Sequence, residues 1–281
     1  MIFSRFITLS LLTLLAGALA LAAAAGRSRA ASSASATQSI GAYTAGCIRN
    51  SAAIPMEGEG FQVIRPGRGR YFANPETIEF IVDLGKRVND AKGIILIGDV
   101  AQQTGGPMLD EHSSHQTGLD ADILYWQHPI ALQRSLTGQE RENIFPQSVL
   151  NDQRTGVDDF KWDERIGKIV KTAASYADVD RIFVNPFVKR KLCSEYPGEL
   201  WLAKLRPWYG HDGHFHVRLK CPAGNASCVP QEPINTHDTG CGSDLASWFT
   251  SSGKIKSQKS SGGGTRPKLP DECIAIINGG A

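Results

Sequence analysis

The chain has little net charge and no repeated architecture. Its 30 lysine and arginine residues nearly balance its 28 aspartate and glutamate residues, which leaves a formal charge of +2 over 281 residues. A chain so close to neutral gives no basis for predicting a nucleic-acid partner, because such proteins present a strongly basic surface. No internal repeat is visible, so the sequence does not divide into copies of one unit.

Several motifs are absent, and their absence limits the possible chemistry. The chain has no S-D-N or K-T-G motif, which accompany S-x-x-K in the penicillin-binding serine enzymes. A match to S-x-x-K at residues 251–254 lies in a Ser/Gly-rich stretch, so a serine mechanism of that type is discounted. The chain also has no C-x2-C pair, which makes a metal site a poor explanation for its cysteines.

The long apolar run of the chain lies at its N-terminus. Arg5 is followed by largely apolar residues from 6 to 25, and the run ends in small residues that offer A-x-A-like cleavage sites. This pattern predicts a secretory signal peptide over residues 1–25. A membrane anchor is the alternative, since about 20 apolar residues can cross a bilayer. The alanine-rich end and the lack of a charge before Arg27 favour cleavage, so we expect no stable membrane insertion.

The rest of the chain divides by composition. Residues 26–46 begin with an Ala/Ser-rich stretch without periodicity, and we expect a flexible lead-in there. Removal of the signal peptide leaves roughly 250 residues, enough for one domain with a sizeable core, and we expect residues 47–249 to form that domain. Residues 250–281 are expected to form a Ser/Gly/Lys-rich flexible linker and a C-terminal segment that returns to the domain at Cys273.

Apolar spacing indicates both helices and strands. Asn74 and Pro75 mark the start of a helix, as its cap and its first residue, and a second amphipathic helix is expected over residues 163–176. Residues 93–97 and 181–184 are expected to be strands. The apolar positions at helical spacing are Ile78, Ile81, Leu84 and Val88 in the first helix and Ile166, Ile169, Val170 and Ala173 in the second. We therefore predict an α+β fold with a small sheet.

Five of the seven histidines fall in two short clusters. In the first cluster, His112 and His115 lie three residues apart, and Asp122 follows His115 by seven. Residues 119–125 alternate as a strand does, which would project Asp120 and Asp122 from one face. Zinc binds neutral imidazole nitrogen and carboxylate oxygen, so His115 and Asp122 are candidate ligands. A catalytic zinc site needs a third protein ligand.

The second cluster supplies candidates for that third ligand. Residues 211–219 contain His211, His214 and His216, and polar and apolar residues alternate strictly from His214 onward. As a strand, this segment aims His214, His216 and Arg218 at one face and buries the apolar residues between them. Arg218 either binds a substrate carboxylate or forms an ion pair at the surface. Position alone does not decide which histidine binds the metal.

The two motifs, H-x6-D and H-x-H, resemble those of the metallopeptidase group that includes lysostaphin-type enzymes, D-Ala-D-Ala carboxypeptidases and the hedgehog signalling domain. Within this group, the chain resembles the penicillin-insensitive murein endopeptidase family. The resemblance rests on S-x-H-Q-x-G-L-D-x-D-I at residues 113–123, V-N-P at 184–186, R-P-W at 206–208 and H-x-x-H-x-H-V-R-L at 211–219. It is dense from about Cys47 to Cys221 and looser in the tail.

The resemblance implies a role for each of these histidines. His115, Asp122 and His216 become the zinc ligands, in a small, mainly antiparallel sheet flanked by helices and disulfide-tied loops. His214 takes the role of base or transition-state stabiliser, with His211 beside it. Zinc would lower the pKa of a bound water to about 7 and polarise a carbonyl for amide hydrolysis.

Other residues near the motifs are considered for supporting roles. Asp120 and Gln116 are candidates to orient the ligand imidazoles. Some members of the group hold a second metal ion, which uses the His112 position and a D-x2-H pair, so His112 is a further candidate ligand. Here Asp152 is followed by Thr155 at the place of that second histidine. A complete second site is therefore not expected.

Export sets the redox context of the cysteines. Six cysteines in a chain bound for an oxidising compartment predict three disulfides. Six cysteines allow 15 pairings, and the sequence alone does not choose among them. The resemblance implies the pairs Cys47–Cys273, Cys193–Cys241 and Cys221–Cys228.

Three functions are weighed. The resemblance implies a periplasmic zinc endopeptidase that hydrolyses D-alanyl–meso-diaminopimelyl amide cross-links in peptidoglycan, or a D,D-carboxypeptidase of the same group. A non-catalytic zinc-containing cell-wall binding protein is the second, but His214 beside the ligand His216 argues against it. A non-haem iron oxygenase is the third, although its two histidines and one carboxylate usually include H-x-D. A hydrogen-bonded polar cluster without a metal is the plain alternative for the site.

Overall fold

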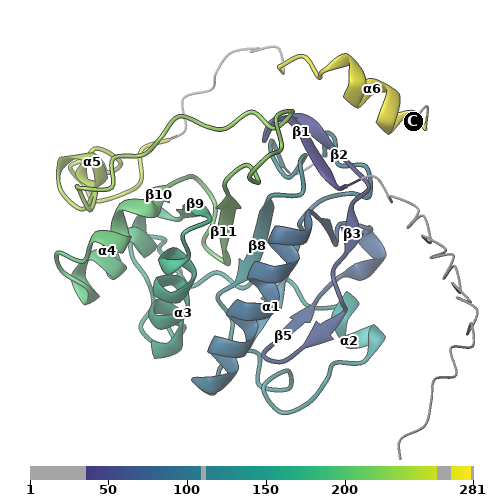
Figure 1. Cartoon of the computed structure of the whole chain (residues 1–281). Coiled ribbons are helices and arrows are strands. Elements are labelled where there is room, and N and C mark those ends of the chain that lie inside the picture. The colour runs from purple at the N-terminus through teal and green to yellow at the C-terminus, as the bar shows by residue number, and fades with distance from the viewer. Residues whose placement is uncertain (1–35, 109–111, 258–266, 280–281) are drawn as a thin grey trace, which may run out of the picture. The chain divides into compact units, whose positions relative to one another are not determined.

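A mixed seven-stranded sheet forms the centre of the fold, in the strand order β10-β9-β11-β8-β7-β5-β4 (Figure 1). Four of its neighbouring pairs are antiparallel, and two, β9 with β10 and β5 with β7, are parallel. Its strands are β4 (Glu57–Gly58), β5 (Phe61–Val63), β7 (Ile95–Ile97), β8 (Asp120–Leu124), β9 (Val179–Val184), β10 (Leu205–Pro207) and β11 (His214–Leu219). The prediction of an α+β fold with a mainly antiparallel sheet is confirmed.

The computed structural model describes residues 36–108, 112–257 and 267–279. The expected signal peptide lies outside these residues, as does part of the expected lead-in and linker. Two strand pairs accompany the large sheet, β1 (Gln38–Ala42) with β2 (Ala45–Arg49) and β3 (Ala52–Ala53) with β6 (Phe72–Ala73). The helical segments are η1 (Pro66–Arg68), α1 (Pro75–Asp90), α2 (Gly138–Glu142), α3 (Glu164–Ser175), α4 (Pro186–Glu195), η2 (Leu200–Lys204), α5 (Ser243–Ala246) and α6 (Asp271–Ile277).

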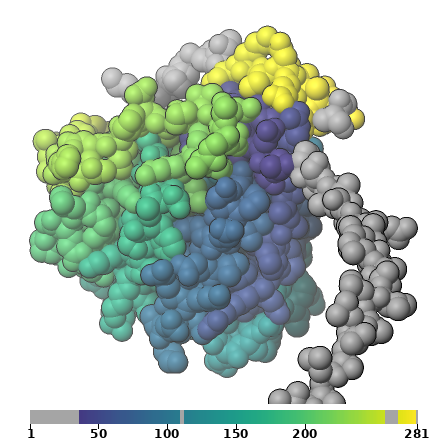
Figure 2. Space-filling view, in the orientation of Figure 1, coloured from purple at the N-terminus to yellow at the C-terminus, as the bar shows by residue number. Residues whose placement is uncertain are grey.

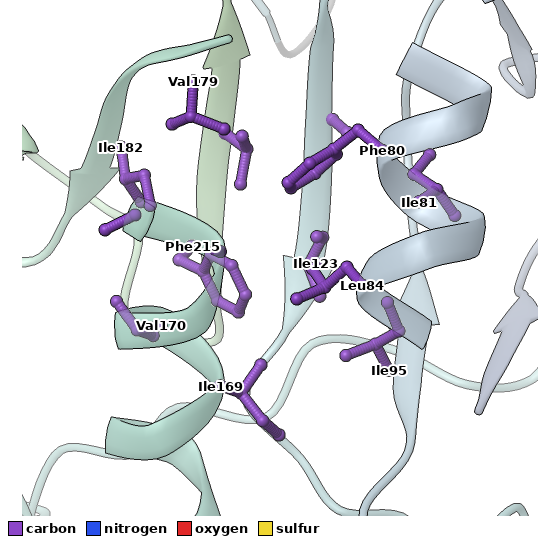
Figure 3. Close-up of a cluster of buried hydrophobic side chains, with 14 of the residues drawn as sticks. Phe80, Ile81, Leu84, Ile95, Ile123, Ile169, Val170, Val179, Ile182 and Phe215 are labelled. Atoms are coloured by element: carbon purple, nitrogen blue, oxygen red, sulfur yellow. The ribbon is translucent and has the colours of Figure 1, made fainter. Parts of the chain in front are cut away.

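Alternation along β8 and β11 separates the core from the functional face. Ile123 of β8 and Phe215 of β11 are buried and directly opposite each other in the sheet. They pack with Leu84 of α1 and Val170 of α3, so both helices cover this face of the sheet (Figure 3). Each fully buried apolar side chain of this size contributes about 1.5–3 kcal/mol to folding. The polar residues of both strands therefore point to the opposite face.

The predicted helices begin where their signals place them. Pro75 is the first residue of α1, although the Asn74 side chain donates to Ser39 Oγ (3.0 Å) and makes no cap hydrogen bond. Asp163 caps α3 by accepting from the backbone N–H of Arg165. The Asn–Pro pair at 185–186 ends β9 as expected, and it also starts α4, because Asn185 accepts from Phe187 N–H.

Three disulfides tie the loops and both ends of the described chain. They join Cys47 to Cys273, Cys193 to Cys241 and Cys221 to Cys228, the pairs that the resemblance implies. Cys47 lies on β2 and Cys273 on α6, so the last helix packs against the first strand pair (Figure 2).

The expected lead-in over residues 26–46 needs correction. β1 and the start of β2 lie within it, so the ordered chain begins earlier than predicted. Ile40 of β1 and Cys47 of β2 are buried against α6, a contact that is distant in sequence and leaves no local pattern. Among the described residues, no helix is both long and apolar enough to cross a membrane.

Candidate metal centre and active site

Strands β8 and β11 bring one carboxylate and one imidazole together. The two strands pair antiparallel with His216 directly opposite Asp122, so both side chains share the face away from α1 and α3. His216 Nδ1 lies 3.3 Å from Asp122 Oδ1. Both residues are buried, at 4% and 5% exposure. A one-residue slip of register would move every one of these side chains to the core face, so strand pairing fixes the contact.

His115 reaches the same carboxylate from the loop before β8. Its Nδ1–H donates to the carbonyl of Val100 (2.8 Å), so the lone pair is on Nε2, which lies 3.3 Å from Asp122 Oδ1. Its backbone is left-handed, with φ of +65°, and its N–H donates to Asp120 Oδ2 (3.0 Å). A non-glycine residue seldom adopts this conformation without compensating contacts. These two hydrogen bonds fix the ring with Nε2 facing the carboxylate.

Asp120 contacts both His115 and His216. The Arg218 guanidinium donates to both of its oxygens, from Nε at 2.7 Å and Nη2 at 3.1 Å. His216 Nε2 lies 3.0 Å from Asp120 Oδ1, which leaves His216 Nδ1 facing Asp122. Burial alone would raise the pKa of Asp120, but Arg218 and His216 hold it well below its usual range. Asp120 is therefore a buried anion that contacts both histidines beside Asp122.

Gln116, a candidate for a supporting role, and Arg218 both contact residues outside the cluster of histidines. Gln116 donates to Thr44 O (2.9 Å) and accepts from Gly46 N–H (3.1 Å), so it anchors the loop to β2 and to the turn before it. Arg218 is buried between the rings of Tyr43 and Phe183 and pairs with Asp120, so it is not a surface residue. Both residues hold the framework of the site.

His112 stands at the rim of the cluster. One ligand atom from each of His112, His115 and Asp122 lies within 4.8 Å of the others, a spacing that can hold a metal ion. His112 Nε2 also lies 2.9 Å from Asp99 Oδ2, which Arg68 and Arg70 contact as well. The structure thus gives Asp122 two neighbouring sets of imidazoles, His115 with His112 and His115 with His216.

Asp99 was not singled out from the sequence. It is buried, and its position next to β7, two residues after Ile97, places it beside Asp122, whose N–H donates to Asp99 O (3.0 Å). The available signal was a carboxylate directly after a buried strand, where polar side chains gather at the end of a sheet. Gly98 lies between Ile97 and Asp99, and its N–H donates to Asp122 O.

Several buried polar atoms in the cluster lack a hydrogen-bond partner. They include His115 Nε2, Asp122 Oδ1 and His216 Nε2. The 3.0 Å approach of His216 Nε2 to Asp120 is close enough for an ion pair but lies outside hydrogen-bond geometry. Leaving such groups unpaired in the interior costs about 1–3 kcal/mol each. A cation between His115 Nε2 and Asp122 Oδ1 would satisfy both, so the donor set fits a metal ion of the zinc type.

The electrostatics also favour positive charge at this point. Burial alone would lower the pKa of His115, but Asp122 and Asp120 raise it to about 9. Burial would raise the pKa of Asp122, but His214 and His115 hold it well below its usual range. For His216, burial outweighs Asp120 and lowers the pKa to about 4. The carboxylates therefore stay ionised and attract one positive charge, from a proton or from a metal ion.

His214 and His211 line the approach to this carboxylate. His214 Nε2 lies 3.5 Å from Asp122 Oδ1, and its side chain is 21% exposed. The ring of His211 is 5.1 Å from that of His214, centre to centre. His211 Nδ1–H donates to Tyr209 O (2.8 Å), and burial, followed by the neighbouring His214, lowers the pKa of His211 to about 3. His211 is therefore a neutral ring, whereas His214 contacts solvent.

Two cavities border the cluster. One, of about 310 Å³, is lined by His112, His211 and His216 together with the aromatic rings of Phe183 and Trp208. The other, of about 220 Å³, is lined by Asp122, His214, His112, Arg65 and Arg68. A larger cavity of about 630 Å³ lies elsewhere, between Trp126 and Trp162. His112 lines both of the smaller cavities.

The residues at the place of the D-x2-H pair lie in a different part of the structure. Asp152 is 91% exposed at its side chain and lies 3.4 Å from Lys161 Nζ, while Thr155 bonds to Asn151. Neither residue belongs to the cluster around Asp122.

Comparison with known proteins identifies the family. The family model described as penicillin-insensitive murein endopeptidase matches residues 39–278. A penicillin-insensitive murein endopeptidase of Klebsiella pneumoniae is 39% identical over 278 residues, which cover 96% of this chain and 97% of that protein. Proteins of the same name are 42% identical in Haemophilus influenzae, over 75% of this chain and 72% of that protein, and 37% identical in Escherichia coli O157:H7, over 96% and 97%. The chain belongs to the penicillin-insensitive murein endopeptidase family.

Proposed function

We propose that this protein is a zinc-dependent endopeptidase that hydrolyses D-alanyl–meso-diaminopimelyl amide cross-links in peptidoglycan. The observation that carries the proposal is the pair of buried atoms without a hydrogen-bond partner, His115 Nε2 and Asp122 Oδ1, which lie 3.3 Å apart beside the cavity lined by Asp122 and His214. Family membership supports the murein substrate. The cleavage of this particular cross-link and the use of zinc go beyond family membership and are part of the proposal.

We assign His115, Asp122 and His216 as the three protein ligands. His115 presents Nε2, because Val100 O holds its other nitrogen, and His216 presents Nδ1, because Asp120 faces its Nε2. Two imidazoles and one carboxylate leave a coordination position for water, as catalytic zinc sites require. His112 is a further ligand candidate, because it belongs to the same cluster as His115 and Asp122. Its Nε2 already contacts Asp99.

When bound, zinc lowers the pKa of a water molecule and polarises the substrate carbonyl. The chain supplies the proton carriers. His214 contacts Asp122 and solvent, so it can accept a proton from the attacking water and pass one to the leaving amine. His211 keeps a hydrogen on Nδ1 for Tyr209 O, which leaves its other nitrogen as an acceptor beside His214. We assign the catalytic role to His214. We assign His211 the role of positioning His214.

We also propose that the protein is exported. Residues 1–25 would direct export and be removed, and the mature protein would act in the periplasm on the cell wall. The three disulfides support this location, because such bonds persist in oxidising compartments and are rare in the cytosol.

The test is digestion of purified cross-linked muropeptides, with product analysis by mass spectrometry. Conversion of dimers to monomers without release of terminal D-alanine is expected. Activity should vanish with a chelator, return with zinc and be indifferent to β-lactams. Release of D-alanine alone would assign the protein as a carboxypeptidase, and full activity in protein shown to be metal-free would contradict the proposal.

A further inference from the structure

Arg65 presents a cation to the active-site cavity, and no carboxylate of the described residues forms an ion pair with it. It lines the 220 Å³ cavity together with Asp122 and His214. Its Nε is buried and has no hydrogen-bond partner. The nearby acids are engaged elsewhere: Glu142 accepts from Gly67 N–H (2.7 Å), and Glu57 pairs with Arg141. An arginine beside a cavity with an unsatisfied donor fits an anionic ligand.

The backbone holds Arg65 in this place at a cost. Its φ is +49°, in the left-handed region that side-chain-bearing residues rarely adopt. Six non-glycine residues among those described have positive φ, and two of the others, His115 and His211, belong to the candidate site. Ile64 N–H donates to Ile97 O and Arg65 N–H to Arg141 O, so the sheet and α2 fix the conformation. Such outliers are maintained most often where they position a functional group.

The ring of Phe145 fixes the other side of the guanidinium. The Arg65 guanidinium carbon lies 5.6 Å from the centre of that ring, within the range of a cation–π contact. Phe145 itself is 53% exposed, so it also borders solvent. A cation–π contact leaves the N–H groups of a guanidinium free, and these groups can bind a carboxylate through two parallel hydrogen bonds.

The proposed substrate carries one carboxylate next to the bond that is cut. On the acyl side, the D-alanine carboxyl group is itself part of the amide. On the amine side, the carbon that bears the scissile nitrogen also bears a free carboxylate. We propose that Arg65 binds this carboxylate, and that the cavity lined by Arg65 therefore receives the amine side of the cross-link. This assignment rests on the proposed function and narrows it to substrates with a free carboxylate at that position.

The experiment compares two cross-linked dimers that differ only in that carboxylate, one free and one converted to the carboxamide. The wild-type protein should lose about 10–100-fold in kcat/KM on the carboxamide, the range expected for one charge-assisted contact. Arg65→Asn, in which asparagine tolerates the left-handed backbone, should lose a similar factor on the free carboxylate and cleave both dimers equally. Arg87→Asn on α1, an exposed arginine on the covered side of the sheet, serves as the matched control and should behave as wild type.

The outcomes separate the two proposals. Equal cleavage of both dimers by the wild type would overturn the role of Arg65 without any variant. An Arg65→Asn protein that still discriminates like the wild type would also overturn it. A wild type that cleaves neither dimer would contradict the proposed function itself. Zinc per chain and the thermal unfolding of each variant should match wild type, so that a loss reports binding of the carboxylate.

Discussion

Replacing Asp120 with asparagine should separate the structural and metal-binding parts of the site. Asp120 is fully buried, and it accepts two hydrogen bonds from Arg218 and one from His115 N–H. Asparagine keeps the shape but removes the charge, so Arg218, itself buried, loses its counter-ion. Breaking a buried ion pair in this way costs about 3–5 kcal/mol. For a domain of this size, that loss lowers the melting temperature by about 10 °C.

The same change should also weaken metal binding. Asp120 faces Nε2 of His216 and holds the backbone of His115, and loss of such supporting contacts typically reduces metal affinity by about 10–100-fold. The assay is chemical unfolding of chelated protein, followed by zinc competition against a chromophoric chelator. Asp83→Asn, in the exposed pair with Arg87 on α1, is the matched control and should leave both measurements unchanged.

A double variant tests whether the two effects have separate causes. Asp120→Asn with Arg218→Met removes both charges, so most of the lost stability should return. Zinc affinity should remain low, because His216 still lacks its carboxylate. If the double variant restores zinc binding together with stability, Asp120 acts on the metal only through the fold. A single variant as stable as wild type would refute the energetic reasoning altogether.

Three further predictions address the ligands, the disulfides and pH. His216→Ala should lose zinc and activity together, whereas His214→Ala should keep near-stoichiometric zinc and lose about 10²–10⁴-fold in kcat; zinc per chain measured beside kcat would show reversed roles if the first retains metal and the second does not. Removing the Cys47–Cys273 disulfide with serines should cost about 2–5 kcal/mol in chemical unfolding, and two or more free thiols in the denatured, unreduced wild type would contradict the disulfide framework. Lys189 of α4 is fully buried, and burial lowers its pKa to about 7, below the value of 10.5 for the free side chain. The unfolded chain therefore binds more protons between those two values, so stability from this residue rises with pH across that window, by up to about 1.4 kcal/mol per unit. Lys189→Met should flatten that rise in unfolding measured from pH 7 to 9.5, and an unchanged slope would show that Lys189 does not titrate there.

The sequence predicted the local features of the site because they depend on alternation. The polar face of β8 and that of β11 follow from a period of two, and both strands have the expected faces. Register is different, since His216 opposite Asp122 depends on pairing between segments that are far apart in the chain. The ion pair of Asp120 with Arg218 spans 98 residues and has no local signal.

The features that were missed share a dependence on distant contacts or on unusual backbone. His115 adopts a left-handed conformation that its residue type does not indicate. The first strand pair has no clear pattern, because α6 buries it from the other end of the chain. For Arg218, the sequence pattern allows an ion pair at the surface. A strand pattern does not reveal that Tyr43 and Phe183 enclose this residue. In each case, the tertiary fold overrides what the local sequence indicates.

The disulfide between β2 and α6 joins the strand pair beside the loop of His115 to a segment that is 226 residues away in sequence. The β1–β2 pair holds this loop directly, because Gln116 bonds to Thr44 and Gly46 and Ser39 Oγ donates to Thr117 O. Cys273 is synthesised after Cys47, and an oxidant must then join the two. The loop that carries His115 therefore rests on a strand pair whose covalent link to α6 forms only after Cys273 has been made and has met an oxidant. A peptidase assembled in this order would complete this covalent brace late, after the segment that carries Cys273 has been synthesised.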